Sequence, residues 1–317
     1  MLILEDLSGE IPDTNSYHWD LKSLSNAGDK NSVLMYGYNS SQNKEFHKLC
    51  SDYDRKIFFN NWAPCEFSQL KDHNDKNAFN YDEWFGEIYS ICPYTSEWLN
   101  GKQLGREYKE IFYPFNKSII PQVYEKEYDV IYHGGLHGQE HYDCLQTMIR
   151  YNYRYCTMSK NINDNTKKFL SYATDKDLKF KEKINLVAKT KVSICYNLVH
   201  IDPKHITAIN SYNRWQENEA LSQVGKWNVK PQFKTRMHEA AISRTLNLVL
   251  KDDWNIAERY YKPDEDFIYF ENKKDLKSKL DDILNNWEDY ENMIENAYNK
   301  AMNYTTEKFV EKIRNDK

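Results

Sequence analysis

The chain has 317 residues, which is long for one domain and enough for two α/β domains of about 150 residues each. Its formal net charge of −5 at pH 7 disfavours wholesale binding to phosphate backbones, so nucleic acid is not the expected partner. The sequence contains no apolar run of about 18 residues, and we therefore expect no transmembrane span.

The cysteines and the first ten residues indicate the compartment. The six cysteines include no C-x-x-C pair, and a chain of this size does not need disulfides to fold. Residues 1–10 carry acids where a signal peptide has basic residues. We therefore expect a cytoplasmic protein with reduced thiols.

In the first half of the chain, short apolar segments alternate with helical patterns. We expect strands or extended segments at residues 2–4, 33–38, 56–60, 90–94 and 111–115. We expect helices at residues 16–27, 41–50, 82–89 and 95–99. Residues 116–125, which contain Pro121, have the composition of a connection between domains.

The second half repeats the alternation. We expect strands at residues 128–132, 192–196, 246–250 and 266–270. We expect helices at residues 139–151, 181–189, 233–243, 255–261, 275–287, 290–303 and 305–313. Residues 200–229 form a polar, partly helical insertion. Alternating strands and helices predict parallel sheets, and open parallel sheets bind ligands at the carboxyl ends of their strands.

The most informative segment is residues 234–241, with the sequence KTRMHEAA. Arg236 and Glu239 are one helical turn apart at a predicted helix start, beside Lys234. An arginine can neutralise a diphosphate, and a glutamate can accept two hydrogen bonds from a ribose diol. An amphipathic helix with an ordinary salt bridge between positions i and i+3 explains this segment equally well.

This segment resembles the donor-binding motif of GT-B glycosyltransferases, in which R-x-x-E-A precedes a small-residue turn and a hydrophobic strand. Residues 262–270, 275–283 and 304–313 resemble the segments that follow in that family, so the resemblance covers roughly the last third of the chain. It implies that Glu239 binds the nucleotide ribose and that Arg236 or Lys234 binds the diphosphate.

Two positions depart from the family pattern. Many retaining members carry a second glutamate eight residues before the ribose glutamate, where this chain has Pro231. Ser243 and Arg244 stand where the family has a small turn residue. The first departure leaves open whether the anomeric configuration is retained or inverted, and the second leaves the geometry of the turn open.

The resemblance implies an α/β fold of two Rossmann-like domains whose parallel sheets face a central cleft. We expect residues 1–122 to form an acceptor-side domain and residues 123–303 a domain that binds the nucleotide-sugar. Residues 304–317 are expected to form a helix that packs back towards the N-terminal domain. The implied reaction is transfer of a sugar from a nucleotide-sugar to the hydroxyl of a glycan, a lipid or another acceptor, without a metal or a further cofactor.

A second segment lies at the end of the predicted strand 128–132, where Gly134 and Gly135 let backbone N–H groups approach a ligand. It resembles the first strand and loop of the GT-B C-terminal domain, whose backbone touches the donor phosphates. A plain tight turn explains the two glycines equally well. The full G-x-G-x-x-G pattern is absent, which disfavours a nicotinamide cofactor.

A metal site is disfavoured. His133, His137 and His141 are spaced by four residues, but the glycines between them interrupt the helix that would align them. No convincing D-x-D motif follows a strand, which disfavours the metal-dependent GT-A fold. We expect these histidines either to contact a phosphate or sugar or to be incidental surface residues.

The acceptor half is harder to interpret. Inverting transfer needs a general base for the attacking hydroxyl, usually a carboxylate or histidine in a loop at a strand end. Glu66 is the first candidate, because its loop also holds amides and a tryptophan, and Asp13 is the second. Each is equally compatible with a solvated loop acid.

Other functions fit the same expected fold. They are a sugar-nucleotide epimerase, a glucosyltransferase for modified DNA bases and a non-catalytic protein that binds nucleotide-sugars. The DNA enzyme needs a basic groove, which the acidic total charge disfavours.

Overall fold

The computed structural model describes residues 2–5, 31–36, 53–60, 86–91, 93, 96, 100, 107–135, 139–158, 171–201 and 228–316. These residues belong to two compact units. Unit 1 contains the described residues up to Lys117 and from Tyr304 onward, and unit 2 contains those from Ser118 to Asn303. None of the helices in these ranges is long and apolar enough to cross a bilayer.

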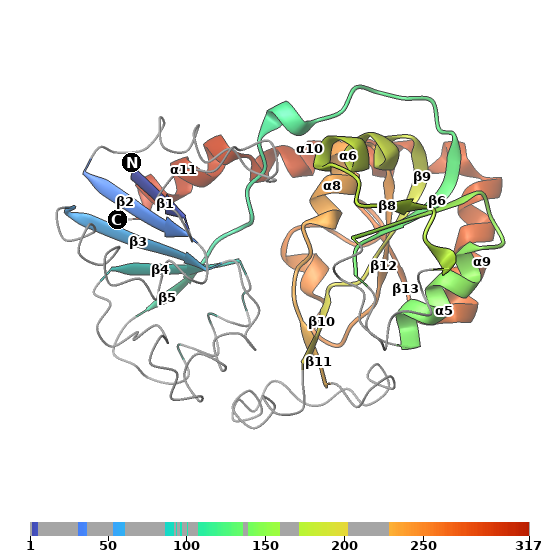
Figure 1. The fold of residues 1–317 in the computed structure, drawn as a ribbon, viewed down its shortest axis with the longest axis horizontal. Helices are drawn as coiled ribbons and strands as arrows, with labels where there is room; N and C mark the ends of the chain where they lie inside the picture. Colours follow the sequence, from blue (N-terminus) through green and yellow to red (C-terminus); the bar gives the residue numbers. More distant parts are fainter. Residues whose placement is uncertain are drawn as a thin grey trace. The chain divides into compact units, whose positions relative to one another are not determined.

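Unit 1 is built on a five-stranded sheet whose strands lie in chain order and are all parallel (Figure 1). The strands are β1 (Leu2–Glu5), β2 (Ser32–Tyr36), β3 (Arg55–Asn60), β4 (Glu87–Ser90) and β5 (Tyr108–Glu110). A short 3-10 helix, η3 (Lys117–Ile119), follows the sheet.

The last two strands of unit 1 begin earlier than the sequence predicts. Residues 87–89 are the end of a predicted helix, but they pair in parallel with β3. The predicted strand 111–115 lies beyond β5, although Ile111 still donates a backbone hydrogen bond to Ser90. Ile111, Tyr113 and Phe115 are buried, so this apolar run packs in the core without joining the ladder as a strand.

The chain returns to unit 1 through α11 (Thr306–Asn315). Backbone hydrogen bonds join Phe115 to Tyr304 and Thr306 to Phe115, at 3.1 and 3.0 Å. The ring of Phe112 packs edge-on against Tyr304 and Phe309, with centroids 5.4 and 6.0 Å away. Aromatic burial therefore fixes the start of this helix on unit 1.

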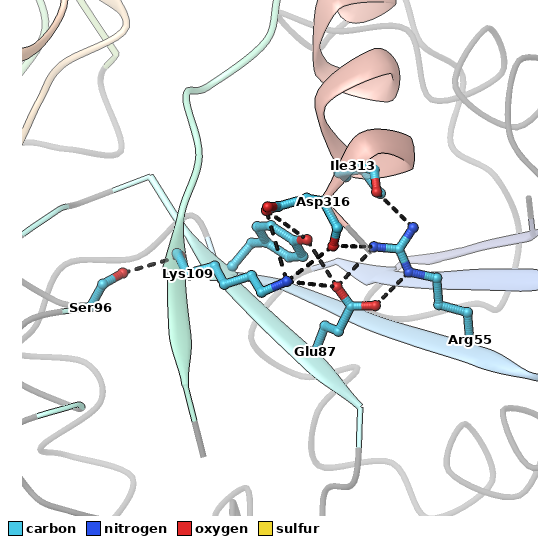
Figure 2. A network of polar contacts seen from close by, with 7 residues as sticks. Arg55, Glu87, Ser96, Lys109, Ile313 and Asp316 are labelled. Carbon is cyan, nitrogen blue, oxygen red and sulfur yellow. Dashed lines mark hydrogen bonds and ion pairs between the residues drawn. The ribbon is translucent and has the colours of Figure 1, made fainter.

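A polar network fixes the other end of α11 (Figure 2). Arg55 forms a two-point ion pair with Glu87 and donates from Nη1 to the carbonyl oxygen of Ile313 at 2.6 Å. Lys109 donates to Glu87 at 3.4 Å and to the carbonyl oxygen of Asp316 at 3.1 Å. Cations at a helix C-terminus donate to its free carbonyl groups and interact favourably with the negative end of the helix dipole. This contact therefore stabilises the position of α11.

Unit 2 contains a six-stranded parallel sheet in the order β13-β12-β9-β6-β7-β8 (Figure 1). The strands are β6 (Tyr128–His133), β7 (Tyr153–Thr157), β8 (Asp175–Lys176), β9 (Thr190–Cys195), β12 (Leu246–Leu250) and β13 (Ile268–Phe270). Because the chain starts near the middle and adds strands on both sides, the sheet is doubly wound.

Two features of unit 2 are absent from the sequence prediction. The strands β7 and β8 extend one side of the sheet. The antiparallel pair β10 (Leu198–Ile201) and β11 (Asn228–Pro231) brackets the predicted insertion 200–229, of which residues 202–227 lie outside the described ranges.

Helices cover both faces of this sheet (Figure 1). They are α5 (Gln139–Met148), α6 (Phe180–Ala188), α8 (Arg236–Ile242), α9 (Lys273–Asn285), α10 (Glu291–Ala301) and the 3-10 turns η8 (Ile256–Arg259) and η9 (Trp287–Tyr290). A further 3-10 turn, η10 (Met302–Tyr304), follows α10 where the chain returns to unit 1. Val130 and Tyr132 pack with α5 and α9, and Ile131 packs with α6 and α8. The alternation along β6 therefore assigns His133 to the face of α6 and α8.

The expected fold class, two α/β units with parallel sheets, is confirmed. The helix α8 begins at Arg236, three residues later than the predicted start of 233. The predicted helix 255–261 is the 3-10 turn η8, whose preceding residue Asn255 has a left-handed backbone conformation. At this turn between β12 and β13 the backbone is therefore wound more tightly than in an α-helix.

Candidate functional site

The chemistry-bearing residues of unit 2 gather at the carboxyl edge of its sheet. The strand β6 ends there at His133, and Gly134 and Gly135 follow. Both α6 and α8 begin at the same edge, because each helix precedes a parallel strand and runs back along the sheet. Lys183 on α6 and Glu239 on α8 are therefore brought next to the end of β6.

Gly134 and Arg236 are in close contact. The backbone of Gly134 has φ +138°, and a Cβ atom there would lie 2.2 Å from Nη2 of Arg236. That φ is rare for residues with a side chain, and a side chain there would also displace the guanidinium of Arg236. Only glycine lets the guanidinium lie against this loop.

The hydroxyl of Tyr132 connects the loop to the arginine. Nη1 of Arg236 donates to it at 2.8 Å, and it donates to the carbonyl oxygen of Gly135 at 2.9 Å. Within the described ranges no carboxylate forms an ion pair with Arg236. A guanidinium has five N–H donors, so this one keeps donors for an anionic ligand.

Glu239 lies in a buried polar cluster. Nζ of Lys183 is 2.8 Å from Oε2 and 3.0 Å from Oε1 of the carboxylate. Nδ1 of His133 is 3.2 Å from Oε2. The side chain of Glu239 is 4% exposed, against 23% for Lys183, so the lysine is the outer member of the pair.

His133 is neutral near pH 7. Burial lowers its pKa to about 4, although Glu239 acts in the opposite direction. Nε2 lies 3.3 Å from the hydroxyl of Ser193, which donates to it when the ring proton is on Nδ1. In that tautomer the proton on Nδ1 lies on the side of the ring nearest Glu239, with Nδ1 3.2 Å from Oε2.

Lys234 lies just before α8. Its backbone N–H donates to Oδ1 of Asn197 at 2.9 Å, and its ammonium donates to Gln232. Since Asn197 follows β9, this bond ties the segment before α8 to the same edge of the sheet.

Some predicted residues lie elsewhere or outside the described ranges. Asp13, Glu66 and His137 are outside them. His141 is buried on α5, with its ring 5.7 Å from that of Tyr132 and 4.5 Å from that of Tyr196. Within the described ranges, no three residues among histidine, cysteine, aspartate and glutamate cluster so as to hold a metal ion.

Sequence reasoning missed two residues of this edge. Tyr132 is one of 25 tyrosines, and its strand position alone does not identify a polar role for it. Lys183 lies in a predicted helix among other lysines, 56 positions before Glu239. Only the pairing of β9 with β12 and the packing of α6 beside α8 bring the lysine to the acid.

No known family matches the chain, and no curated protein matches it. Solved structures do match its fold. HepE of Anabaena, solved with UDP-glucose, aligns at a TM-score of 0.58 and 10% identity over 93% of this chain and 80% of that one.

Two further structures align in the same way. Sucrose-phosphate synthase of Thermosynechococcus elongatus has a TM-score of 0.57 and 9% identity, over 90% of this chain and 72% of that chain. TarM has a TM-score of 0.52 and 11% identity, over 93% of this chain and 57% of that chain. The protein therefore has the GT-B fold, as the motif at residues 234–241 implies.

Proposed function

We propose that the protein is a glycosyltransferase that moves a sugar from a nucleotide-sugar donor to an acceptor hydroxyl. The observation that carries the proposal is the guanidinium of Arg236, which lies against the backbone of Gly134 and has only Tyr132 as a described hydrogen-bond partner. It lies at the edge where open parallel sheets bind ligands. The HepE structure with UDP-glucose supports the same class of donor.

In this proposal Arg236 binds the donor diphosphate, assisted by Lys234 and by backbone N–H groups at Gly134 and Gly135. A guanidinium suits this role because it can donate two parallel hydrogen bonds to phosphate oxygens. Glu239 binds the ribose. The positive charge of Arg236 stabilises the nucleoside diphosphate as it leaves, so no metal ion is needed for that step.

The acceptor and the base complete the proposal. We assign acceptor binding to residues 1–122, with Glu66 as the first candidate base and Asp13 as the second. The base takes the proton of the attacking hydroxyl. We also propose that the enzyme works in the cytoplasm, because the described cysteines, Cys144, Cys156 and Cys195, are free thiols.

A melting screen with UDP-, GDP-, ADP- and CMP-sugars tests the proposal. A ligand that binds the folded state raises the melting temperature by mass action. Arg236→Ala should abolish the shift, and Glu239→Ala should weaken binding by about 1–3 kcal/mol. Arg150→Ala, which removes an exposed arginine of unit 2, should leave the shift unchanged.

An assay for release of the sugar from the best ligand then separates the remaining functions. Slow hydrolysis without an acceptor is the expected result for a transferase. Binding without any sugar release would favour a non-catalytic nucleotide-sugar-binding protein, and conversion of the donor to another nucleotide-sugar would favour an epimerase. Absence of a shift with every donor would contradict the proposal.

A further inference from the structure

The carboxylate of Glu239 is covered by the ammonium of Lys183. Nζ of Lys183 donates to Oε1 at 3.0 Å and lies 2.8 Å from Oε2. His133 is itself buried, with Nδ1 3.2 Å from Oε2. The ammonium therefore occupies the approach to both carboxylate oxygens before any ligand is present.

A ribose diol donates one hydrogen bond from each of its two hydroxyls to the carboxylate. It reaches both oxygens only if Lys183 leaves, because the ammonium lies within 3.0 Å of each of them. His133 is buried against Ser193 and cannot make room. We propose that Lys183 occupies the ribose-binding positions of Glu239 in the free protein and that the nucleotide displaces it. This inference rests on the proposed function, in which Glu239 binds the ribose.

The position of Lys183 allows this exchange. Its side chain is 23% exposed and covers a carboxylate that is 4% exposed, so a ligand from solvent reaches the lysine first. Its ammonium also lies 4.6 Å from the centroid of the Phe180 ring, which gives the cation a second favourable contact.

Because of this exchange, the protein selects its ligand by the two ribose hydroxyls. A nucleotide with both hydroxyls replaces the bonds that Glu239 loses when Lys183 leaves. A 2′,3′-dideoxy nucleotide has no donors for the carboxylate, so it binds with Lys183 still in place. Lys183 thereby acts as a specificity-determining residue, because a buried carboxylate left without partners is unfavourable.

Lysine acetylation followed by mass spectrometry tests the exchange in the wild-type protein. The probes are whichever of UDP, GDP and ADP stabilises the protein most and its 2′,3′-dideoxy analogue, each at saturation by calorimetry. We expect acetylation of Lys183 to rise about threefold or more with the ribonucleotide and to stay unchanged with the dideoxy analogue, because displacement frees the amine. Lys181 on the same helix is exposed and serves as the internal control.

A pair of variants gives a second measurement. Lys183→Met removes the competing cation, so we expect the ribonucleotide to bind about fivefold more tightly, since the ligand no longer has to break the ion pair. Lys181→Met removes the same charge from the same helix without touching Glu239, and its affinity should match the wild type. Any loss of general electrostatic attraction would affect both variants.

The outcomes separate the two proposals. If the ribonucleotide binds but acetylation of Lys183 falls or does not change, the displacement is wrong and the proposed function stands. If no nucleoside diphosphate binds the wild type, the proposed function is wrong and this inference falls with it. Should Lys183→Met fail to fold, acetylation of the wild type still decides.

Discussion

The hydroxyl of Tyr132 lies 2.8 Å from Nη1 of Arg236, which is 104 positions away in the sequence. The same hydroxyl donates to the carbonyl oxygen of Gly135 at 2.9 Å. One buried group therefore fixes both the arginine of α8 and the loop after β6. A binding site that is fixed before the ligand arrives loses less entropy on binding.

The first prediction concerns this hydroxyl. Tyr132→Phe leaves Arg236 and the carbonyl of Gly135 without their shared partner, and an unsatisfied buried group costs about 1–3 kcal/mol. We expect nucleotide affinity to fall by about tenfold, measured by calorimetry, together with a lower melting temperature.

Tyr155→Phe is the matched control for Tyr132→Phe. Its ring lies 5.9 Å from that of Tyr132 in the same aromatic cluster, but Arg236 donates to Tyr132 and not to Tyr155. The control should bind the nucleotide as tightly as the wild type. Equal losses of affinity in both variants would contradict a positioning role for Tyr132.

The second prediction concerns Gly134. Gly134→Ala forces a side chain into a backbone with φ +138° and onto the guanidinium of Arg236. We expect the unfolding free energy to fall by about 1–3 kcal/mol in urea titrations and nucleotide binding to weaken at least tenfold.

A double-mutant cycle separates the two causes of that loss. In an Arg236→Ala background the steric overlap disappears. Gly134→Ala should then lower the unfolding free energy by a smaller amount, which reflects the backbone strain alone. If Gly134→Ala lowers the unfolding free energy by the same amount with and without the arginine, the contact between the two residues does not contribute to the loss.

The third prediction is a pH dependence. Burial lowers the pKa of His133 to about 4, against about 6.5 in the unfolded chain. Between these values the unfolded state binds a proton that the folded state excludes, so stability falls as the pH drops from 6.5 to 4. We expect His133 to account for a loss of roughly 3 kcal/mol over this range.

His133→Asn removes the titration and keeps an amide donor near the position of Nδ1. The difference in unfolding free energy between wild type and variant should therefore decrease from pH 7 to pH 4. Burial also raises the pKa of Asp252 to about 6, which acts in the opposite direction, but that group is present in both proteins and cancels in the comparison. A difference that is constant with pH would contradict the buried neutral histidine.

The core strands and the edge residues of unit 2 could be predicted from the sequence. Residues 128–132, 192–196 and 246–250 are short apolar runs, and such runs form the buried centre of a parallel sheet. The chain order then places Arg236 and Glu239 at the carboxyl edge without further information.

The partners of those edge residues could not be predicted. The pair of Lys183 and Glu239 depends on the packing of two helices that are separated in the chain by β9, β10 and β11, which no local pattern encodes. The strand β7 contains Arg154 and directly follows a helix, so its local pattern is weak and its pairing with β6 decides its structure. The apolar run 111–115 is predicted as a strand but does not form one. It is buried without pairing in the sheet, and a buried apolar segment has the same composition whether or not it pairs.

The last prediction concerns the C-terminal helix of unit 1 (Figure 2). Arg55→Met leaves Glu87 without its two-point partner and the carbonyl oxygen of Ile313 without its donor. The side chain of Arg55 is only 16% exposed, so solvent replaces these contacts poorly. We expect the unfolding free energy to fall by about 2 kcal/mol and hydrogen exchange to accelerate at the end of α11.

Another ion pair within unit 1, between Lys117 and α11, provides the control for Arg55→Met. Lys117 lies 3.8 Å from Glu307, with side chains 56% and 62% exposed. Water screens such a pair, so Lys117→Met should change stability by no more than about 0.5 kcal/mol and leave hydrogen exchange in α11 unchanged. If both variants lose the same stability, the network around Arg55 contributes no more than a surface contact. If Arg55→Met alone accelerates exchange, the partly buried cations at the helix C-terminus fix α11 on the sheet.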